Sequence, residues 1–140
     1  MEEVISGDVR LGWIIRREYR KKGIEFVTPG DYSQQLGYMR RERGYTVQPH
    51  VHNIVERRVH LTQEVLFIRE GRVRVDFFSQ DKEYLLSKVV VKGDVVLLAE
   101  GGHGVTMLEE SEIVEVKQGP YIGERDKIRF EYDGPIRIEE

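Results

Sequence analysis

The strongest constraint on the fold is a series of short β-type segments between residues 64 and 117, separated by glycine or polar turns. Residues 72–77 alternate polar and apolar side chains with period two, the pattern of a half-buried strand. They follow the apolar segment 64–70 across the single residue Gly71, so the two segments predict a hairpin. A chain patterned in this way folds into sheets rather than helices.

Further strands are expected at 35–40, 45–52, 84–91, 94–98, 105–108 and 113–117, with one or two short strands in the tail at 128–138. Pro49 places the segment 45–52 at an edge or a bulge, because proline cannot donate a ladder hydrogen bond. We expect no helix longer than two turns and no internal repeat. Strands this short, at spacings of about 8–12 residues, predict a sandwich or a small barrel.

Composition supports an all-β fold. Valine occurs 18 times and isoleucine 11 times, whereas alanine occurs once, at Ala99. Alanine is the strongest helix former, and β-branched residues favour pleated surfaces. With 140 residues the chain is predicted to form a single domain over 1–140. This length is enough to bury a hydrophobic core that needs no disulfide or metal to be stable.

Charge and the absence of cysteine exclude several classes of function. The formal net charge of −3 argues against nucleic acid as the main partner. The basic run 16–22 is interpreted as a solvated face rather than an anion-binding or nucleic-acid patch, because no second basic cluster supports it. The chain has no cysteine, no apolar run near the ~20 residues of a membrane span and no signal-peptide pattern. We therefore expect a cytoplasmic protein with no membrane partner.

Four histidines are the main candidates for chemistry. His50 and His52 are two residues apart, so on a strand both imidazoles face the same side. With a carboxylate and a third histidine nearby they would form a transition-metal site, although such pairs also occur on surfaces by chance. The pair alone leaves both interpretations open.

The surrounding residues resemble the two conserved motifs of the cupin superfamily. Residues 44–71 contain Gly-X5-His-X-His followed by Glu-X6-Gly, and residues 93–103 read Gly-X5-Ala-X-Gly-Gly-His. The resemblance covers about residues 44–118, which would form the core. It implies a double-stranded β-helix, or jelly-roll barrel, that holds one divalent transition metal (Fe, Mn, Ni, Cu or Zn). The implied ligands are His50, His52, Glu64 and His103.

The chain departs from the family pattern at several positions. Eleven residues separate His52 from Glu64, where three or four are usual, and Glu56 lies at the usual interval. We favour Glu64, because it begins an apolar strand, whereas Glu56 precedes two arginines and indicates an exposed hairpin tip. In the second motif Ala99 replaces the usual proline, Met107 stands where asparagine is frequent, and one residue is missing before the histidine.

Four further residues are weaker candidates for substrate binding: His60, Gln63, Gln118 and Tyr121. His60 shares a face with Glu64 if the stretch is one strand, and Gln63 is adjacent to it. Gln118 and Tyr121 follow the last core strand, near the place where the resemblance implies an open barrel mouth. Each has a structural alternative, such as a partly exposed hairpin histidine or a tyrosine that caps the core.

The expected function is binding or conversion of a small oxygen-rich metabolite, such as a sugar derivative or a keto acid, at the mononuclear metal site. The resemblance is also compatible with a ligand-binding or regulatory protein without turnover. A third alternative is a metal-free sugar-nucleotide isomerase or epimerase, in which His50 or His103 acts as the base. Fold-level analogy does not choose among dioxygenase, isomerase and non-catalytic roles, so no residue is assigned as catalytic.

A homodimer is also expected. Residues 1–30 form an N-terminal segment outside the motif region, and within it 4–27 is apolar enough to cover a sheet of the partner. Residues 1–60 carry 11 basic and 8 acidic groups, and residues 61–140 carry 11 and 17. The opposite net charges of the two parts, +3 and −6, would favour association of two chains.

Overall fold

The computed structural model describes residues 1–140 and is all-β, as predicted. The ten strands are β1 (Glu2–Ser6), β2 (Val9–Ile15), β3 (Gly23–Phe26), β4 (Gly37–Arg40), β5 (Glu64–Glu70), β6 (Arg72–Phe78), β7 (Tyr84–Val91), β8 (Val95–Leu98), β9 (Gly102–Met107) and β10 (Glu112–Lys117). One 3-10 turn, η1, spans Gly123–Asp126. No helix in the structure is long and apolar enough to cross a membrane.

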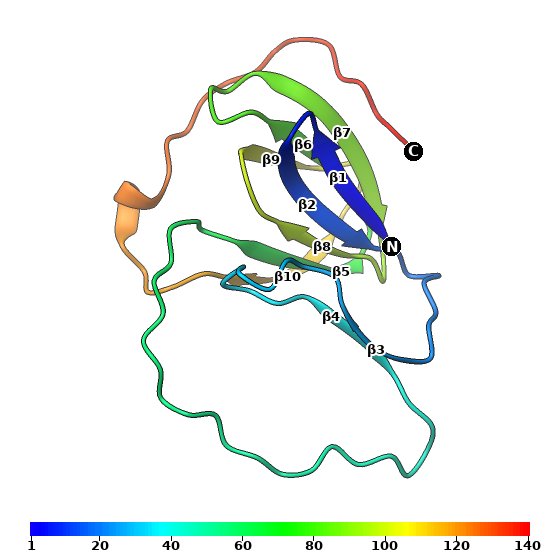
Figure 1. The fold of residues 1–140 in the computed structure, drawn as a ribbon. Helices are drawn as coiled ribbons and strands as arrows, with labels where there is room; N and C mark the ends of the chain where they lie inside the picture. The colour runs from blue at the N-terminus through cyan, green and yellow to red at the C-terminus, as the bar shows by residue number, and fades with distance from the viewer.

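Two antiparallel sheets pack face to face to form the body of the protein (Figure 1). The five-stranded sheet has the order β1-β2-β8-β5-β10, and the three-stranded sheet has the order β7-β6-β9. Neither sheet closes on itself. Their inner faces supply one core of twelve buried side chains, in which Phe77 is the largest that is fully buried. The period-two pattern of β6 directs Val73, Val75 and Phe77 into this core.

The hairpin between β5 and β6 forms at Gly71, as the sequence predicts. Gly71 has a φ of +86°, a left-handed conformation that glycine adopts without steric cost. A Cβ atom at this position would also lie 2.4 Å from the backbone oxygen of Glu110. The turn therefore requires glycine for its conformation and for the close approach of the chain before β10.

One side of the body is closed by a network of charged groups. Glu2 of β1 binds Lys88 of β7 at 2.5 Å and Arg16 at 2.9 Å, so it joins the edge strands of the two sheets. Arg16 also donates to the backbone oxygen of Val89 at 2.7 Å and to Asp94 at 3.2 Å. These contacts link the N-terminal strands to the turn between β7 and β8.

The opposite side of the body is open. Strands β9 and β10 end their sheets, and no further strand pairs with their outer edges. Val105 and Met107 of β9 lie opposite the buried Val75 and Val73 and share their inward face, yet 38% and 51% of their surfaces are exposed. The inner face of the three-stranded sheet is thus uncovered along this edge.

The N-terminal segment joins its own body rather than standing outside it. Strands β1 and β2 are hydrogen-bonded in the five-stranded sheet, where β2 pairs with β8. Val4, Leu11 and Ile14 belong to the core. The sequence pattern of residues 4–17 is irregular, and no strand was predicted there.

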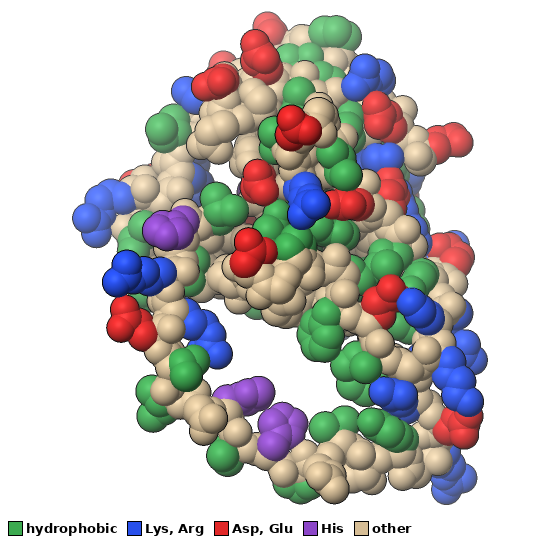
Figure 2. Space-filling view, viewed as in Figure 1, with side chains coloured by type: hydrophobic (Ala, Val, Ile, Leu, Met, Phe, Trp, Pro, Cys, Tyr) green, Lys and Arg blue, Asp and Glu red, His purple; other side chains and the backbone are tan.

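Strands β3 and β4 form a separate hairpin, which continues into an extended segment, residues 46–62, that we call the arm. The arm has no regular structure and makes no backbone-to-backbone hydrogen bond. The prediction of a strand at 45–52 is therefore wrong for this chain, because a strand forms only beside a neighbour that accepts its hydrogen bonds. Figure 2 shows the arm enclosing an opening below the body.

The C-terminal tail does not form the short strands expected at 128–138. A single bridge pairs Ile138 with Ser87 of β7, supported by backbone hydrogen bonds from Ser87 to Arg137 and from Glu139 to Ser87, both at 2.9 Å. Aromatic contacts take the place of a ladder: Tyr132 stacks on Tyr84 with ring centroids 4.9 Å apart. The strand expected at 105–108 begins earlier, at Gly102, because the glycines after Ala99 continue the ladder with β6.

Candidate functional site: a carboxylate–imidazole pair at the open side

The open side of the body brings Glu64 and His103 together. Glu64 begins β5 and shares the inward face of Leu66 and Ile68, while His103 of β9 lies opposite the buried Phe77. The Nε2 atom of His103 is 3.1 Å from a carboxylate oxygen of Glu64. The Glu64 side chain is 11% exposed and that of His103 is 31% exposed. The pair joins the two sheets at the edge where they are open.

Electrostatics keeps Glu64 ionised. The hydrogen bond with His103 is the largest cause that holds the pKa of Glu64 below its ordinary value, and it outweighs the burial that raises it. Lys117, directly across from Glu64 in the β5–β10 ladder, places its ammonium group 3.6 Å from the other carboxylate oxygen. The site therefore presents an anionic carboxylate beside an imidazole and a cation.

A C-terminal turn completes the wall of the site. Asp126, at the end of η1, accepts a hydrogen bond of 2.7 Å from the hydroxyl of Thr62 and lies 3.8 Å from the ammonium group of Lys117. These contacts attach η1 to the start of β5, although more than sixty residues separate them in the sequence. The turn thereby brings the charged segment that follows it to the open side.

The pair lies in a cavity of about 830 Å³ that also extends around the free edge of β9. His60 and Thr62 line it on the side of the arm, and Arg74 and Asp76 line it on the outer face of the three-stranded sheet. Its walls are rich in cations, with five basic side chains against three carboxylates. The basic side chains are Arg74, Lys82, Arg125, Lys127 and Arg129, and the acidic ones are Glu64, Asp76 and Asp126. This excess of positive charge suits an anionic, oxygen-rich ligand.

The structure places the four sequence-derived metal ligands as two separate pairs. Glu64 and His103 are in contact, whereas His50 and His52 lie on the arm, with ring centroids 5.1 Å apart. His50 Nδ1 is 2.8 Å from the backbone oxygen of Gln48. No group of three or more metal-ligating side chains occurs within this single chain.

Glu56, the rival carboxylate, lies on the exposed arm. Its side chain is 85% exposed, and its nearest charged partner is Arg58 at 3.8 Å. The structure therefore gives it the solvated surroundings expected from the sequence.

The weaker substrate candidates differ in their positions. His60 lines the cavity, but Gln63, Gln118 and Tyr121 do not. Gln63 is 1% exposed, and its side-chain oxygen accepts hydrogen bonds from the Ser33 hydroxyl and the Gln34 backbone N–H, so it holds a loop in place. Gln118 donates to the neighbouring Gly119 oxygen, and Tyr121 is 87% exposed.

Sequence reasoning did not identify Lys117 or the segment 125–129 as part of the site. Lys117 and Ile113 lie on the same face of β10, and Ile113 packs against the core. The alternation of β10 therefore indicates that Lys117 also faces inward, but only once the pairing of β10 with β5 is known. Segment 125–129 carries no such local signal, because the contact of Asp126 with Thr62 brings it to the site.

Comparison of the chain with protein-family models, with curated proteins and with solved structures found no match. The fold and the site define the protein as an all-β protein with two facing sheets, a separate β3–β4 hairpin, and a carboxylate–imidazole pair in an open, cation-rich cavity.

Proposed function

We propose that this chain is a small cupin-like jelly-roll protein that binds one divalent transition metal and, beside it, a small anionic, oxygen-rich metabolite. The observation that carries the proposal is the contact of Glu64 with His103 inside the cation-rich cavity. Carboxylate and imidazole groups are the ligands that Fe, Mn, Ni, Cu and Zn share, so this donor set fits such a metal without selecting one. His50 and His52 would complete the set.

The protein side chains have separate roles in this proposal. Glu64, kept ionised, would bind the metal together with His103, and Lys117 would balance the negative charge of the carboxylate. The basic groups of the segment 125–129 would bind and orient a carboxylate or phosphate of the metabolite, a sugar derivative or a keto acid. A bound metal would act as a Lewis acid or activate oxygen.

The same contact supports a second candidate, a metal-free isomerase or epimerase that acts on a sugar nucleotide. Here Glu64 would orient the imidazole of His103 through Nε2, and the other ring nitrogen would move a proton of the substrate. A third role, ligand binding or regulation without turnover, uses the same cavity. Oxygen uptake or conversion of a sugar substrate separates the first two from the third.

Metal content of the protein, purified without chelator, tests the leading proposal. We expect about one divalent transition metal per chain in the native protein. Glu64→Gln should weaken metal affinity about tenfold or more, because it removes a charged ligand from a largely buried position. The matched control, Glu56→Gln, should leave affinity within about twofold, since an exposed charge contributes little.

Two results would count against the metal site. A native protein free of metal under these conditions would favour the acid–base candidate. If Glu56→Gln lost the metal and Glu64→Gln kept it, the shorter motif spacing after His52 would be correct instead.

A further inference from the structure

The cavity extends well beyond the Glu64–His103 pair. It continues around the free edge of β9 to the outer face of the three-stranded sheet. This face carries the polar and aromatic members of the β6 alternation, whose other members fill the core. We call this part of the cavity the outer lobe, and its lining includes Arg74, Asp76, Phe78, Gly104, Thr106 and Phe130.

Two glycines leave the backbone of β9 bare in the outer lobe. Gly104 lies opposite Asp76 in a β6–β9 ladder without a bulge, and neither Gly104 nor Gly102 has a positive φ. A Cβ atom at Gly104 would meet only side-chain atoms, none closer than 3.8 Å, so crowding does not require glycine there. Glycine inside a regular strand often marks a place where a ligand or another backbone approaches closely. No other backbone does so at Gly104, and the space beside it is open.

A buried carboxylate faces this space. The Asp76 side chain is 10% exposed, and its Oδ1 atom accepts hydrogen bonds from Arg74 Nε and from the Ser87 hydroxyl. Its Oδ2 atom accepts only Arg74 Nη2, at 3.0 Å, and lies 3.9 Å from where a Cβ atom of Gly104 would stand. Arg74 Nη1 donates to no group of the chain. The outer lobe therefore offers one unused acceptor beside one unused donor.

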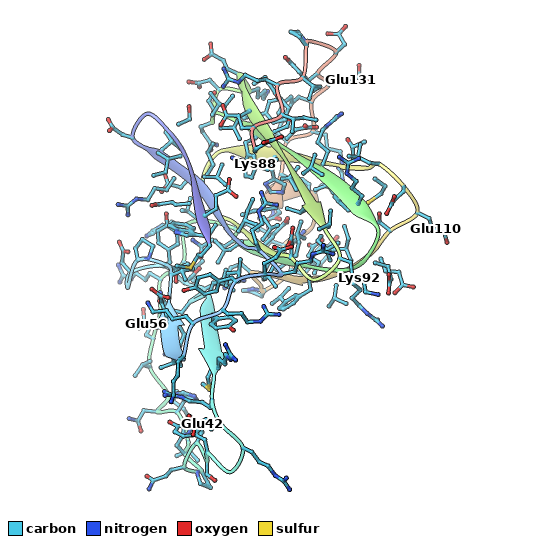
Figure 3. All side chains as sticks on the ribbon, turned by 90° about the vertical axis from the view of Figure 1, so that its right-hand side faces the viewer. Glu42, Glu56, Lys88, Lys92, Glu110 and Glu131 are labelled. Atoms are coloured by element: carbon cyan, nitrogen blue, oxygen red, sulfur yellow. The ribbon has the colours of Figure 1, made fainter.

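An aromatic wall closes one side of the outer lobe. Phe130 of the C-terminal tail packs edge-to-face on Phe78 with ring centroids 5.0 Å apart, and 36% of its surface remains exposed. Tyr132, 5.5 Å from Phe78, extends the wall. The tail, labelled at Glu131, lies at the opposite end of the molecule from Glu56 of the arm (Figure 3). The wall thus presents a flat apolar surface to a ring.

Three cations of the cavity have no acidic partner. Of its five basic side chains, two are neutralised by ion pairs of 2.8 and 2.6 Å. The other three, Lys82, Arg125 and Lys127, form no ion pair. Lys127 is close enough to Glu64 for its charge to help lower the pKa of that carboxyl group. The cavity near Glu64 therefore suits the anionic group of a ligand, whereas the outer lobe suits a flat ring.

We propose that the outer lobe binds a nucleobase and that the ligand of this protein is a nucleotide, with its phosphate among the unpaired cations. This deepens the proposed function and rests on it, because it identifies the anionic, oxygen-rich metabolite as a phosphorylated sugar that carries a base. A nucleobase has a π-face that stacks on aromatic rings and an edge that carries donors and acceptors side by side. That edge matches Asp76 Oδ2 and Arg74 Nη1. The cavity of about 830 Å³ suits a ligand of this size, whereas a keto acid would leave most of it empty.

A series of small ligands tests the nucleobase on the native protein. Isothermal titration calorimetry compares the monophosphates of adenosine, guanosine, cytidine and uridine with ribose 5-phosphate, which lacks the base, and with phenyl phosphate, whose ring has no polar edge. We expect at least one nucleotide to bind about tenfold or more tightly than ribose 5-phosphate, and more tightly than phenyl phosphate. The nucleobase is excluded if no nucleotide binds more tightly than ribose 5-phosphate, or if phenyl phosphate equals the best nucleotide.

Two variants test the position of the base. Gly104→Val introduces a side chain that suits a strand and fills the space beside Asp76, so nucleotide affinity should fall to that of ribose 5-phosphate. Phe130→Leu keeps apolar packing but removes the ring, and it should weaken nucleotide binding about tenfold even if Gly104→Val does not fold. Affinity for ribose 5-phosphate should stay within about twofold in both variants. Folded variants that bind the nucleotide as tightly as the native protein would place the base elsewhere.

The matched control is Gly30→Val. Gly30 is exposed, has no neighbour within 4 Å and lies outside the cavity, so this variant should bind every ligand of the series as the native protein does. A loss of nucleotide binding in Gly30→Val equal to that in Gly104→Val would overturn the assignment of the outer lobe.

The same titrations, repeated after treatment with a chelator, separate this inference from the metal site. Stacking and the Arg74–Asp76 edge need no metal, so the preference for a nucleotide over ribose 5-phosphate should persist. A protein that holds no metal but prefers a nucleotide supports the outer lobe and removes the metal site. A protein that holds the metal but shows no such preference keeps the metal site and overturns the nucleotide.

Discussion

Asp94 is expected to be one of the most sensitive positions outside the core. It follows the tight turn between β7 and β8, and only 2% of its surface is exposed. One carboxylate oxygen accepts the Arg17 backbone N–H at 2.8 Å, and the other accepts the Val91 N–H at 3.0 Å and Arg16 Nη1 at 3.2 Å. Both oxygens are thus required as acceptors.

Asp94→Asn keeps the size of the side chain but replaces one acceptor with an NH₂ donor. Whichever way the amide is turned, that donor faces at least one buried N–H, and the charge-assisted contact with Arg16 is weakened. An unpaired buried donor costs about 1–3 kcal/mol, and hydrogen bonds to charged groups contribute about 1.5–3 kcal/mol. We therefore expect a loss of about 3 kcal/mol in the free energy of unfolding, or about 10 °C in Tm for a chain of this length.

Equilibrium unfolding in urea measures this loss as a lower midpoint with an unchanged m-value. Asp8→Asn is the matched control, because Asp8 is exposed in the β1–β2 turn, and it should change stability by less than about 0.5 kcal/mol. If Asp94→Asn unfolds at the same urea concentration as the native protein, the network does not hold the closed side together.

Two further predictions concern the body of the protein. Glu2→Gln should lower the free energy of unfolding by about 1–2 kcal/mol at neutral pH. Burial raises the pKa of Glu2, but Lys88 and Arg16 lower it by more, so the folded-state pKa lies below the ordinary value of 4.5. The stability difference between the variant and the native protein should therefore be present above pH 4.5 and disappear as the pH falls through the folded-state pKa, which urea unfolding at a series of pH values measures. Gly101→Ala should cost more than about 3 kcal/mol, because its Cβ would lie 2.3 Å from the Phe78 oxygen at a φ of +73°. Gly7→Ala is the matched control, because Gly7 has a φ of +58° but no neighbour within 4 Å, and it should cost about 1 kcal/mol. Thermal melts of the two variants measure both losses.

Local pattern was sufficient for most strands. The apolar run of β5, the period-two alternation of β6 and the glycine turn at Gly71 are properties of neighbouring residues. The bounds expected at 64–70 and 84–91 agree with the structure. The same rule failed at 45–52, whose residues have an equally strand-like pattern. The difference is that β5 has β8 and β10 beside it, whereas the arm has no neighbour within its own chain.

In the candidate site, too, some features follow from local sequence and others only from tertiary contacts. The sequence by itself determined an all-β chain and singled out Glu64 and His103, because alternation and motif spacing are properties of short stretches of residues. Only the tertiary structure decided that these two side chains meet, that Lys117 and Asp126 join them, and that His50 and His52 stand apart on the arm. Those contacts depend on sheet order and on which edge is left open, and both follow from packing between segments that lie far apart in the chain.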